Sequence, residues 1–247
     1  FTIDLFHPLR QRDDIDELNQ ARDMSIYRAY MHNQIRELMT NFGKIDIVWF
    51  DFSYPGREPG GKGHDDWDSM KIYQMVRQLQ PEIIIDNRLD LPREYADIYT
   101  PEQVQPREWI HVDGEPVVWE ACQTFSGSWG YYRDETSWKS PGQLIRMLVN
   151  MVALGGNLLM NVGPTAKGQF DRRAQDALQV YGAWMDMHAD AIYGCTMSEF
   201  TAPPDCRLTQ KDGRVYVHIF AYPFKHLQID GMGDKVEYAQ FLHDGSQ

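Results

Sequence analysis

The sequence predicts an α/β fold, namely a partial (β/α)8 TIM-like barrel followed by the start of a small antiparallel β domain. Short apolar segments alternate with amphipathic helices, which is the pattern of a parallel sheet with helices outside. One strand with its helix takes about 30 to 35 residues, as in such barrels. After Gly194 shorter alternating segments begin, so we expect the barrel part over residues 1–195 and a β-sandwich-like domain starting over residues 196–247.

The helices and strands are predicted from local patterns. The expected helices have apolar residues at helical spacing and suitable end residues, such as Gly43 after the first, and they cover residues 24–42, 67–80, 141–154 and 171–188. The expected parallel strands are short and apolar, as if buried on both faces, and they cover residues 45–51, 82–88, 117–122 and 157–163. Since a closed barrel needs eight strands, the chain holds the second half of one, with the end of an earlier strand at residues 1–6.

The C-terminal segment is expected to be antiparallel. Residues 206–210, 214–221 and 227–230 alternate between apolar and polar side chains, and residues 211–213 read Lys-Asp-Gly, a hairpin turn.

Composition excludes several classes of partner. The net charge of −12 argues against nucleic acid and anionic membranes as partners. No apolar run approaches the roughly 20 residues that span a bilayer. The three cysteines have no zinc-ligand spacing, and no other metal pattern stands out. We therefore expect no metal, no cofactor and no membrane partner, while assembly into a homo-oligomer stays open.

Polar residues end the predicted strands, where the active sites of such barrels lie. Asp51, Arg88 and Glu120 stand at three of these ends, and Glu102 lies in the loop after the second strand. A pair of carboxylates suits glycoside hydrolysis, because one attacks the anomeric carbon and the other protonates the leaving oxygen. The alternative for any one residue is a solvated strand end or a buried ion pair, for example Asp51 with Arg88.

Four segments in order resemble those of the family 29 α-L-fucosidases. They are the Trp-containing strand that ends in Asp51, the Asp-Asn-Arg of residues 86–88, the Trp-Glu-Ala-Cys-Gln-Thr of residues 119–124 with Ser-Trp-Gly-Tyr at 128–131, and the Gly-Gly-Asn-Leu-Leu-Met-Asn-Val-Gly-Pro of residues 155–164. The family reads Asn-Asp-Arg in the second segment, but Arg88 keeps its place. The resemblance covers about 60% of the chain, over residues 44–193.

The resemblance implies a glycoside hydrolase, specifically a retaining exo-α-L-fucosidase that removes terminal fucose from a fucosylated oligosaccharide or glycoconjugate. Asp51 is then the nucleophile. Glu102 is the expected acid/base, because bacterial members carry it in a similar Thr-x-Glu stretch, and Glu120 is the rival. Two other readings stay open: a non-catalytic carbohydrate-binding relative, and a barrel glycosidase for another sugar such as galactose.

The same resemblance implies substrate-binding residues. Trp49 is expected beneath the fucose, Arg88 and Glu120 at its hydroxyls, and Trp129 against its apolar side. His7 is a weaker candidate, since the His-His pair of the family does not occur in the chain. That pair and a signal region are expected upstream of Phe1, and the resemblance favours a periplasmic, secreted or lysosomal location.

Overall fold

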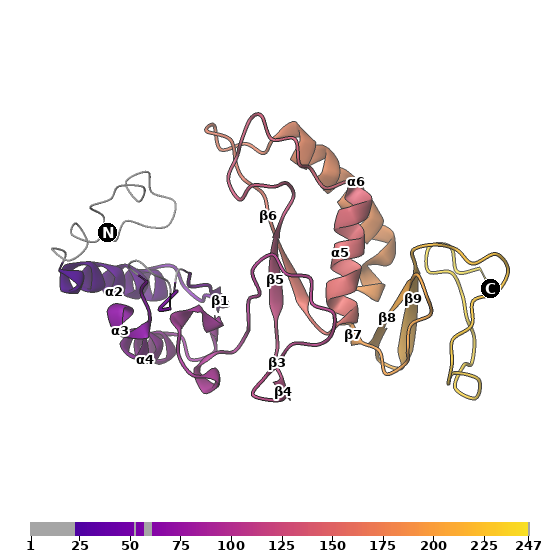
Figure 1. The fold of residues 1–247 in the computed structure, drawn as a ribbon, viewed down its shortest axis with the longest axis horizontal. Coiled ribbons are helices and arrows are strands. Elements are labelled where there is room, and N and C mark those ends of the chain that lie inside the picture. The colour runs from indigo at the N-terminus through magenta and orange to yellow at the C-terminus, as the bar shows by residue number, and fades with distance from the viewer. Residues whose placement is uncertain (1–22, 52, 57–60, 247) are drawn as a thin grey trace. The chain divides into compact units, whose positions relative to one another are not determined.

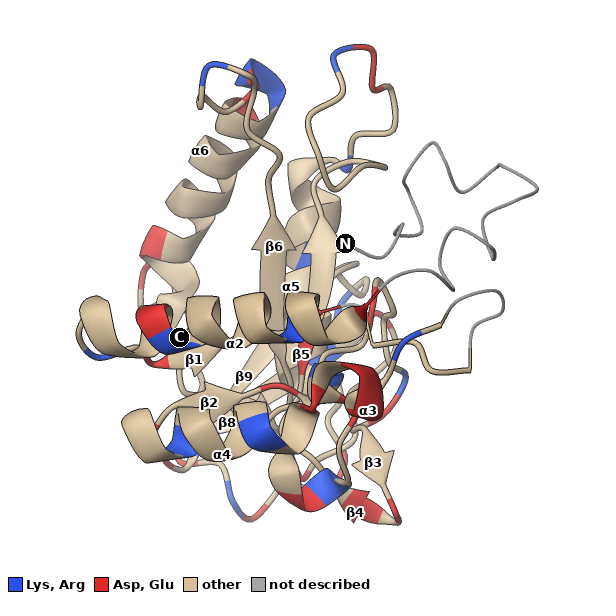
Figure 2. Cartoon of the chain, turned by 90° about the vertical axis from the view of Figure 1, so that its left-hand side faces the viewer, with Lys and Arg blue, Asp and Glu red and all other residues tan. Residues whose placement is uncertain are grey.

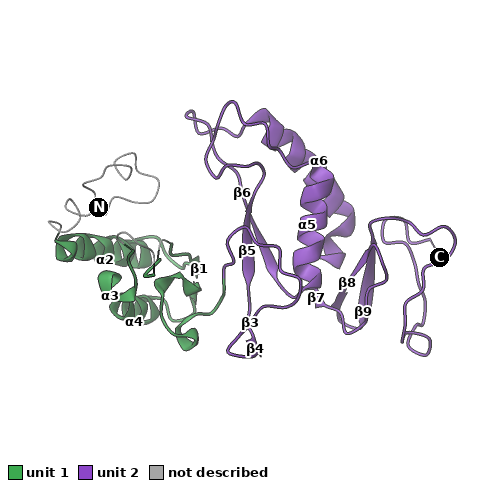
Figure 3. Ribbon diagram, in the orientation of Figure 1, with its two compact units in different colours: residues 1–99 green, residues 100–247 purple. Residues whose placement is uncertain are grey.

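The computed structural model describes residues 23–51, 53–56 and 61–246. The chain divides into two compact units, residues 1–99 and 100–247 (Figure 3). Each unit is described by itself. The boundary predicted between residues 195 and 196 is a different division of the chain and stays a prediction.

Unit 1 contains two short parallel strands and two longer helices (Figure 1). The first helix begins after Asp23, whose side chain accepts a hydrogen bond from the Ser25 amide, as an N-cap does. Strands β1 and β2 pair in parallel, with Ile47 opposite Ile84. The elements are α2 (Met24–Asn41), β1 (Ile47–Val48), α3 (His64–Trp67), α4 (Ser69–Leu79), β2 (Ile84–Ile85) and two 3-10 helices (Asn87–Leu89 and Arg93–Tyr95).

Helices α2 and α4 cover only one face of β1 and β2. Val48 and Ile85 point into the core that these helices form, with buried Ile35, Ile72 and Val76. On the opposite face, Ile47 is 47% exposed and Ile84 is 36% exposed. Within unit 1 the expectation that these strands are buried on both faces is therefore wrong, because no described element of this unit covers the second face.

A short acidic helix precedes α4 in unit 1. Figure 2 shows α3 coloured red for acidic residues, and its first turn contains Asp65 and Asp66. Carboxylates there are favoured by the partial positive charge of a helix N-terminus. His64 Nδ1 lies 3.1 Å from Asp90 Oδ2, so this histidine ties α3 to the loop after β2.

Unit 2 contains a parallel β/α arrangement with helices on one face. Strands β5 (Glu120–Thr124) and β6 (Asn157–Asn161) pair in register from Glu120 opposite Asn157 to Thr124 opposite Asn161. Helix α5 (Pro141–Ala153) connects them, and α6 (Arg172–His188) follows β6 and lies beside α5 (Figure 1). Ser140 begins α5 with a reciprocal capping box, and Pro141 takes the first turn.

The side chains of β5 and β6 divide between two faces. Met160 and Val162 pack against the core formed by Phe125, Leu144 and Ala177, which places them on the helix side. Because side chains alternate along a strand, Glu120, Cys122, Leu159 and their neighbours at every second position lie on the face without helices. We call this the helix-free face of β5–β6.

The predicted strand over residues 117–122 is shifted. The observed β5 begins at Glu120 and runs to Thr124, so the expectation that Glu120 ends this strand is wrong. Pairing decides the boundaries: Val117 donates its amide to the Ile110 carbonyl, whereas residues 120–124 meet β6. An apolar run identifies a buried segment but not the residues that find a partner strand.

The other strands are antiparallel. A hairpin of β3 (His111–Val112) and β4 (Glu115–Pro116) was not predicted. Strands β7 (Thr196–Met197), β8 (Cys206–Lys211) and β9 (Arg214–Ile219) form a three-stranded sheet, and the hairpin between β8 and β9 confirms the predicted one. The strand expected over residues 227–230 is wrong, since this segment forms no ladder with any described strand.

The described parallel strands form two separate pairs, β1–β2 and β5–β6. Parallel strands with following helices are thus present, while a closed barrel is not seen within residues 23–51, 53–56 and 61–246. Across the same residues, no helix is both long and apolar enough to cross a bilayer.

Candidate active site

An ion pair lies just beyond β1. The expectation that Asp51 ends this strand is wrong, because β1 ends at Val48 and Asp51 follows three residues later. Arg88 Nη1 donates a hydrogen bond of 2.7 Å to Asp51 Oδ1, and the Arg88 guanidinium lies 4.2 Å from the centre of the Trp49 ring. The Arg88 side chain is only 12% exposed, whereas that of Asp51 is 36% exposed. The pair therefore holds a fixed cation below a carboxylate that solvent or a ligand can reach. The structure brings together these three residues, which were all singled out from the sequence.

Asp86 bonds to the main chain beside both members of this pair, and it was not predicted as a site residue. Its side chain is buried, and its Oδ1 accepts hydrogen bonds from the Phe50 amide at 3.1 Å and the Arg88 amide at 3.4 Å. Burial raises the pKa of Asp86 to about 7, although the two amide hydrogen bonds and the charge of Arg88 act against this rise. The available sequence signal was a carboxylate directly after three isoleucines.

The loops after β1 and β2 are also joined by side chains. Ser53 Oγ donates to the Arg88 carbonyl at 2.6 Å, and Trp67 Nε1 donates to Ser53 Oγ at 3.1 Å. The backbone at Arg88 is therefore bonded at its amide and at its carbonyl. This leaves little freedom for the segment that positions the guanidinium.

Glu102 in unit 2 is held against β5 by main-chain pairing. It forms a parallel bridge with Cys122, in which the Cys122 amide donates to the Pro101 carbonyl at 3.3 Å and the Gln103 amide donates to the Cys122 carbonyl at 3.1 Å. Glu102 Oε2 lies 3.4 Å from Cys122 Sγ. The Glu102 carboxylate thus lies on the helix-free face of β5–β6, although its residue belongs to a loop.

Glu120 lies on the same face at the first residue of β5. It stands two residues before Cys122, so the two glutamates are offset by about 7 Å along the strand. Burial raises the pKa of the Glu120 carboxyl. A raised pKa suits a general acid, but the position at the amino end of the strand does not suit the active-site edge of a barrel.

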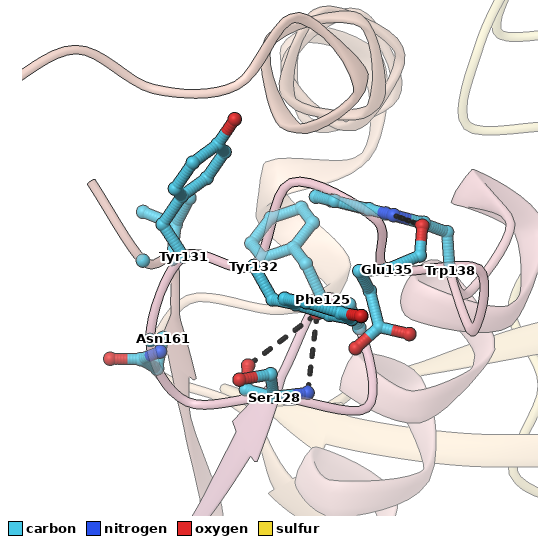
Figure 4. Close-up of a pocket in the computed structure, with 11 residues that line it drawn as sticks. Phe125, Ser128, Tyr131, Tyr132, Glu135, Trp138 and Asn161 are labelled. Atoms are coloured by element: carbon cyan, nitrogen blue, oxygen red, sulfur yellow. Dashed lines mark hydrogen bonds between the residues drawn. The ribbon is translucent and has the colours of Figure 1, made fainter. Parts of the chain in front are cut away.

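A pocket opens at the carboxyl ends of β5 and β6 (Figure 4). Asn161 Nδ2 donates to the Trp129 carbonyl at 2.7 Å, which fixes the loop carrying Trp129, and the Trp129 side chain is 38% exposed. No lining residue was predicted as a site residue, although several lie in the segments 128–131 and 155–164 singled out from the sequence. The lining consists of Phe125, Ser126, Ser128, Gly130, Tyr131, Tyr132, Glu135, Trp138, Asn161, Val162 and Gly163. Its aromatic and hydroxyl groups are of the kind that bind sugars.

Close backbone contact shapes this pocket. A Cβ atom added at Gly163 would lie 2.5 Å from the Gly130 carbonyl carbon and from the Tyr131 amide nitrogen. The end of β6 therefore touches the main chain of the loop that follows β5. Only glycine at position 163 permits this approach.

Two further expectations concern ligands. His7 lies outside the described residues. In the part of the chain that the structure describes, no group of three or more His, Cys, Asp and Glu side chains is arranged to hold a metal ion.

Parallel β/α units with carboxylates at strand ends and loops are typical of the glycoside hydrolases that are built on barrels. The α-L-fucosidase family model matches residues 2–190. The chain therefore belongs to the α-L-fucosidase family, glycoside hydrolase family 29.

Several proteins similar to this chain are α-L-fucosidases or are derived from one. Plasma alpha-L-fucosidase of Rattus norvegicus is 31% identical over 225 residues, which are 86% of this chain and 46% of the relative. The structure of alpha-L-fucosidase isoenzyme 1 from Paenibacillus thiaminolyticus is 38% identical with a TM-score of 0.88, and the match covers 100% of this chain and 59% of that one. A Thermotoga maritima alpha-L-fucosynthase in complex with α-L-Fuc-(1-2)-β-L-Fuc-N3 is 28% identical with a TM-score of 0.64, over 85% and 45% of the two chains. The chain spans about half the length of the curated relatives.

Proposed function

We propose that the protein containing this chain is a retaining exo-α-L-fucosidase acting on terminal α-linked fucose of a glycan. The observation that carries the proposal is the partly exposed Asp51 carboxylate held at 2.7 Å by Arg88, just beyond the end of a strand, in a member of the fucosidase family. A carboxylate held in place by a buried cation and still open to solvent is suited to nucleophilic attack.

The proposed reaction has two steps. Asp51 attacks the anomeric carbon and forms a covalent glycosyl-enzyme, while Glu102 gives its proton to the departing glycosidic oxygen. Glu102 then takes a proton from water as the water oxygen attacks the same carbon, which frees fucose and restores the Asp51 carboxylate. No cofactor is required by this sequence of bond changes.

The remaining site residues are proposed to bind fucose. Arg88 covers one face of the Trp49 indole, so the fucose ring is expected against the other face. Arg88 donates to sugar hydroxyls, Trp129 contacts the apolar side with the C6 methyl, and Glu120 accepts from hydroxyls.

The acid/base assignment rests on position. The strand pairing of Glu102 supports it, since that pairing holds the carboxylate near the middle of β5, while Glu120 stands at the amino end. The raised pKa of Glu120 favours the rival, so the two carboxylates need a direct test.

That test compares Glu102→Gly and Glu120→Gly in the full-length enzyme, with and without azide. Azide is a nucleophile that needs no proton removed, so in the second step it can attack the anomeric carbon in place of water, release the Asp51 carboxylate and raise the rate without the missing base. We expect azide to accelerate only Glu102→Gly and to give fucosyl azide. Acceleration of Glu120→Gly alone would transfer the acid/base role to Glu120.

A panel of nitrophenyl glycosides tests the substrate. We expect release of nitrophenol from the α-L-fucoside at a rate at least tenfold above that from galactosides and other sugars. A preference for galactose would make the protein a barrel glycosidase of another specificity, and no release from any substrate would leave the carbohydrate-binding relative.

A further inference from the structure

The buried carboxyl of Asp86 joins the two segments that follow β1 and β2 and carry the candidate nucleophile and its arginine. Its Oδ1 accepts from the Phe50 amide at 3.1 Å and from the Arg88 amide at 3.4 Å. Phe50 immediately precedes Asp51 in the chain. One oxygen atom therefore fixes the main chain beside both partners of the 2.7 Å ion pair.

We propose that Asp86 is a positioning residue for the reaction: its buried carboxyl, through the Phe50 and Arg88 amides, holds Asp51 and Arg88 in the geometry that attack requires. This inference rests on the proposed function. Asp86 acts through its neighbours and does not itself touch the sugar, since its side chain is only 1% exposed. Small displacements of a nucleophile are costly, with about 1 Å reducing rates by up to 10²-fold.

The ladder between β1 and β2 is too short to hold Asp51 and Arg88 by itself, so the hydrogen bonds to Asp86 are needed to connect the segments that follow the two strands. Only Ile47 with Ile84 and Val48 with Ile85 pair in the ladder between β1 and β2. Beyond Val48, the bonds to Asp86 continue the connection toward Asp51 and Arg88. Ser53 adds a second connection through the Arg88 carbonyl, but it does not constrain the Phe50 amide.

The charge of Asp86 adds a second consequence. The charged groups that face it are Asp51 and Arg88, and its pKa of about 7 means that it gains a negative charge near neutral pH. Its Oδ2 has no hydrogen-bond partner among the described residues. An asparagine would keep an Oδ1 acceptor for both amides and would remove the titration.

Asp97 provides a matched control, because its carboxylate also bonds to the main chain of β2. Its carboxylate accepts from the Ile85 amide at 2.7 Å and pairs with Arg77. It is thus also an aspartate bonded to the β2 backbone, but its bonds go to Ile85 and Arg77 and not to Phe50 or Arg88. Loss of Asp97 lowers stability without reaching Asp51 or Arg88.

The experiment uses the full-length enzyme and the variants Asp86→Ala, Asp86→Asn and Asp97→Asn. We expect Asp86→Ala to lower kcat on nitrophenyl α-L-fucoside at least tenfold with a smaller change in KM, and Asp86→Asn to recover most of that loss. The pH profile of Asp86→Asn should lack the inflection near pH 7, while Asp97→Asn should keep the wild-type profile and lose only thermal stability.

Binding of a fucose-configured iminocyclitol, measured by calorimetry, provides a readout without turnover. We expect Asp86→Ala to weaken it at least tenfold and Asp86→Asn less than threefold. Wild-type kcat and inhibitor affinity in Asp86→Ala would overturn the inference, as would equal losses in Asp86→Asn and Asp97→Asn. A wild-type enzyme that binds the inhibitor but releases no nitrophenol would contradict the proposed function instead, and the binding comparison would still decide the role of Asp86.

Discussion

Replacing Asp86 by asparagine should stabilise the protein at pH 8 and change its stability little at pH 4. The wild-type carboxyl is buried and accepts two amide hydrogen bonds through Oδ1. Asparagine has nearly the same shape and can accept the same bonds. The difference between the two side chains is therefore the negative charge that aspartate acquires as pH rises.

The sign follows from the direction of the pKa shift. Folding raises the pKa of Asp86 from an ordinary 3.8 to about 7, so between these values the folded state binds more protons than the unfolded state. The contribution of Asp86 to the free energy of unfolding thus falls as pH rises from about 4 to about 7 and is constant above that range. The rise of the Asp86 pKa from 3.8 to about 7 corresponds to about 4 kcal/mol of unfolding free energy, because one pKa unit is worth about 1.4 kcal/mol.

The assay is denaturant unfolding of full-length wild type and Asp86→Asn at pH 4, 5, 6, 7 and 8, followed by tryptophan fluorescence. The gain in free energy of unfolding from the substitution should grow from below about 1 kcal/mol at pH 4 to about 4 kcal/mol at pH 8. Asp97→Asn serves as the control and should show no such growth, because Arg77 compensates the charge of Asp97. A gain that is independent of pH, or a loss at pH 8, would refute the reasoning.

Three further predictions concern unit 2. Ser140→Ala removes the capping hydroxyl of α5 and should cost about 1 kcal/mol in thermal unfolding. Gly156→Ala should cost about 3 kcal/mol or more, because its Cβ would overlap the buried Trp119 ring, while Gly142→Ala, with open space around it, should be neutral or stabilising. Burial lowers the pKa of His218 to about 4, so its imidazole NMR signals should not shift between pH 8 and pH 6; titration near pH 6.5 would contradict that burial.

The helices were predictable because their signals are local. Ser140 and Pro141 mark the start of α5 within the chain itself. In α2, by contrast, only Ile35 and Met39 of the apolar residues at helical spacing are buried. The observed α2 and α5 each end one residue before the predicted end. Capping and periodicity require only neighbours a few residues away.

The strands were less predictable because their ends depend on partners. The run of isoleucines before Asp86 predicted a strand through residue 88, but the ladder stops at Ile85 and a 3-10 helix begins at Asn87. Likewise Glu120 moved from the end of a strand to its start, since β6 determines which residues of that segment pair. Such pairing joins residues that are distant in the sequence.

Dependence on residues distant in the sequence also explains which parts of the candidate site were predicted and which were missed. Asp51, Arg88 and Trp49 were singled out together, and the structure places them in contact. Asp86 was missed because its importance comes from the amides it meets, which no local pattern reveals. The bridge between Glu102 and Cys122 was missed for the same reason.

The contact between Gly163 and the loop at Gly130 also limits which side chains position 163 can accept. Because a side chain at position 163 would meet main-chain atoms rather than a movable side chain, the loop would have to shift to admit it. That loop carries Trp129 and lines the pocket. We therefore expect that a side chain at position 163 would displace this loop and change the shape of the pocket, unless a second replacement in the loop made room for it.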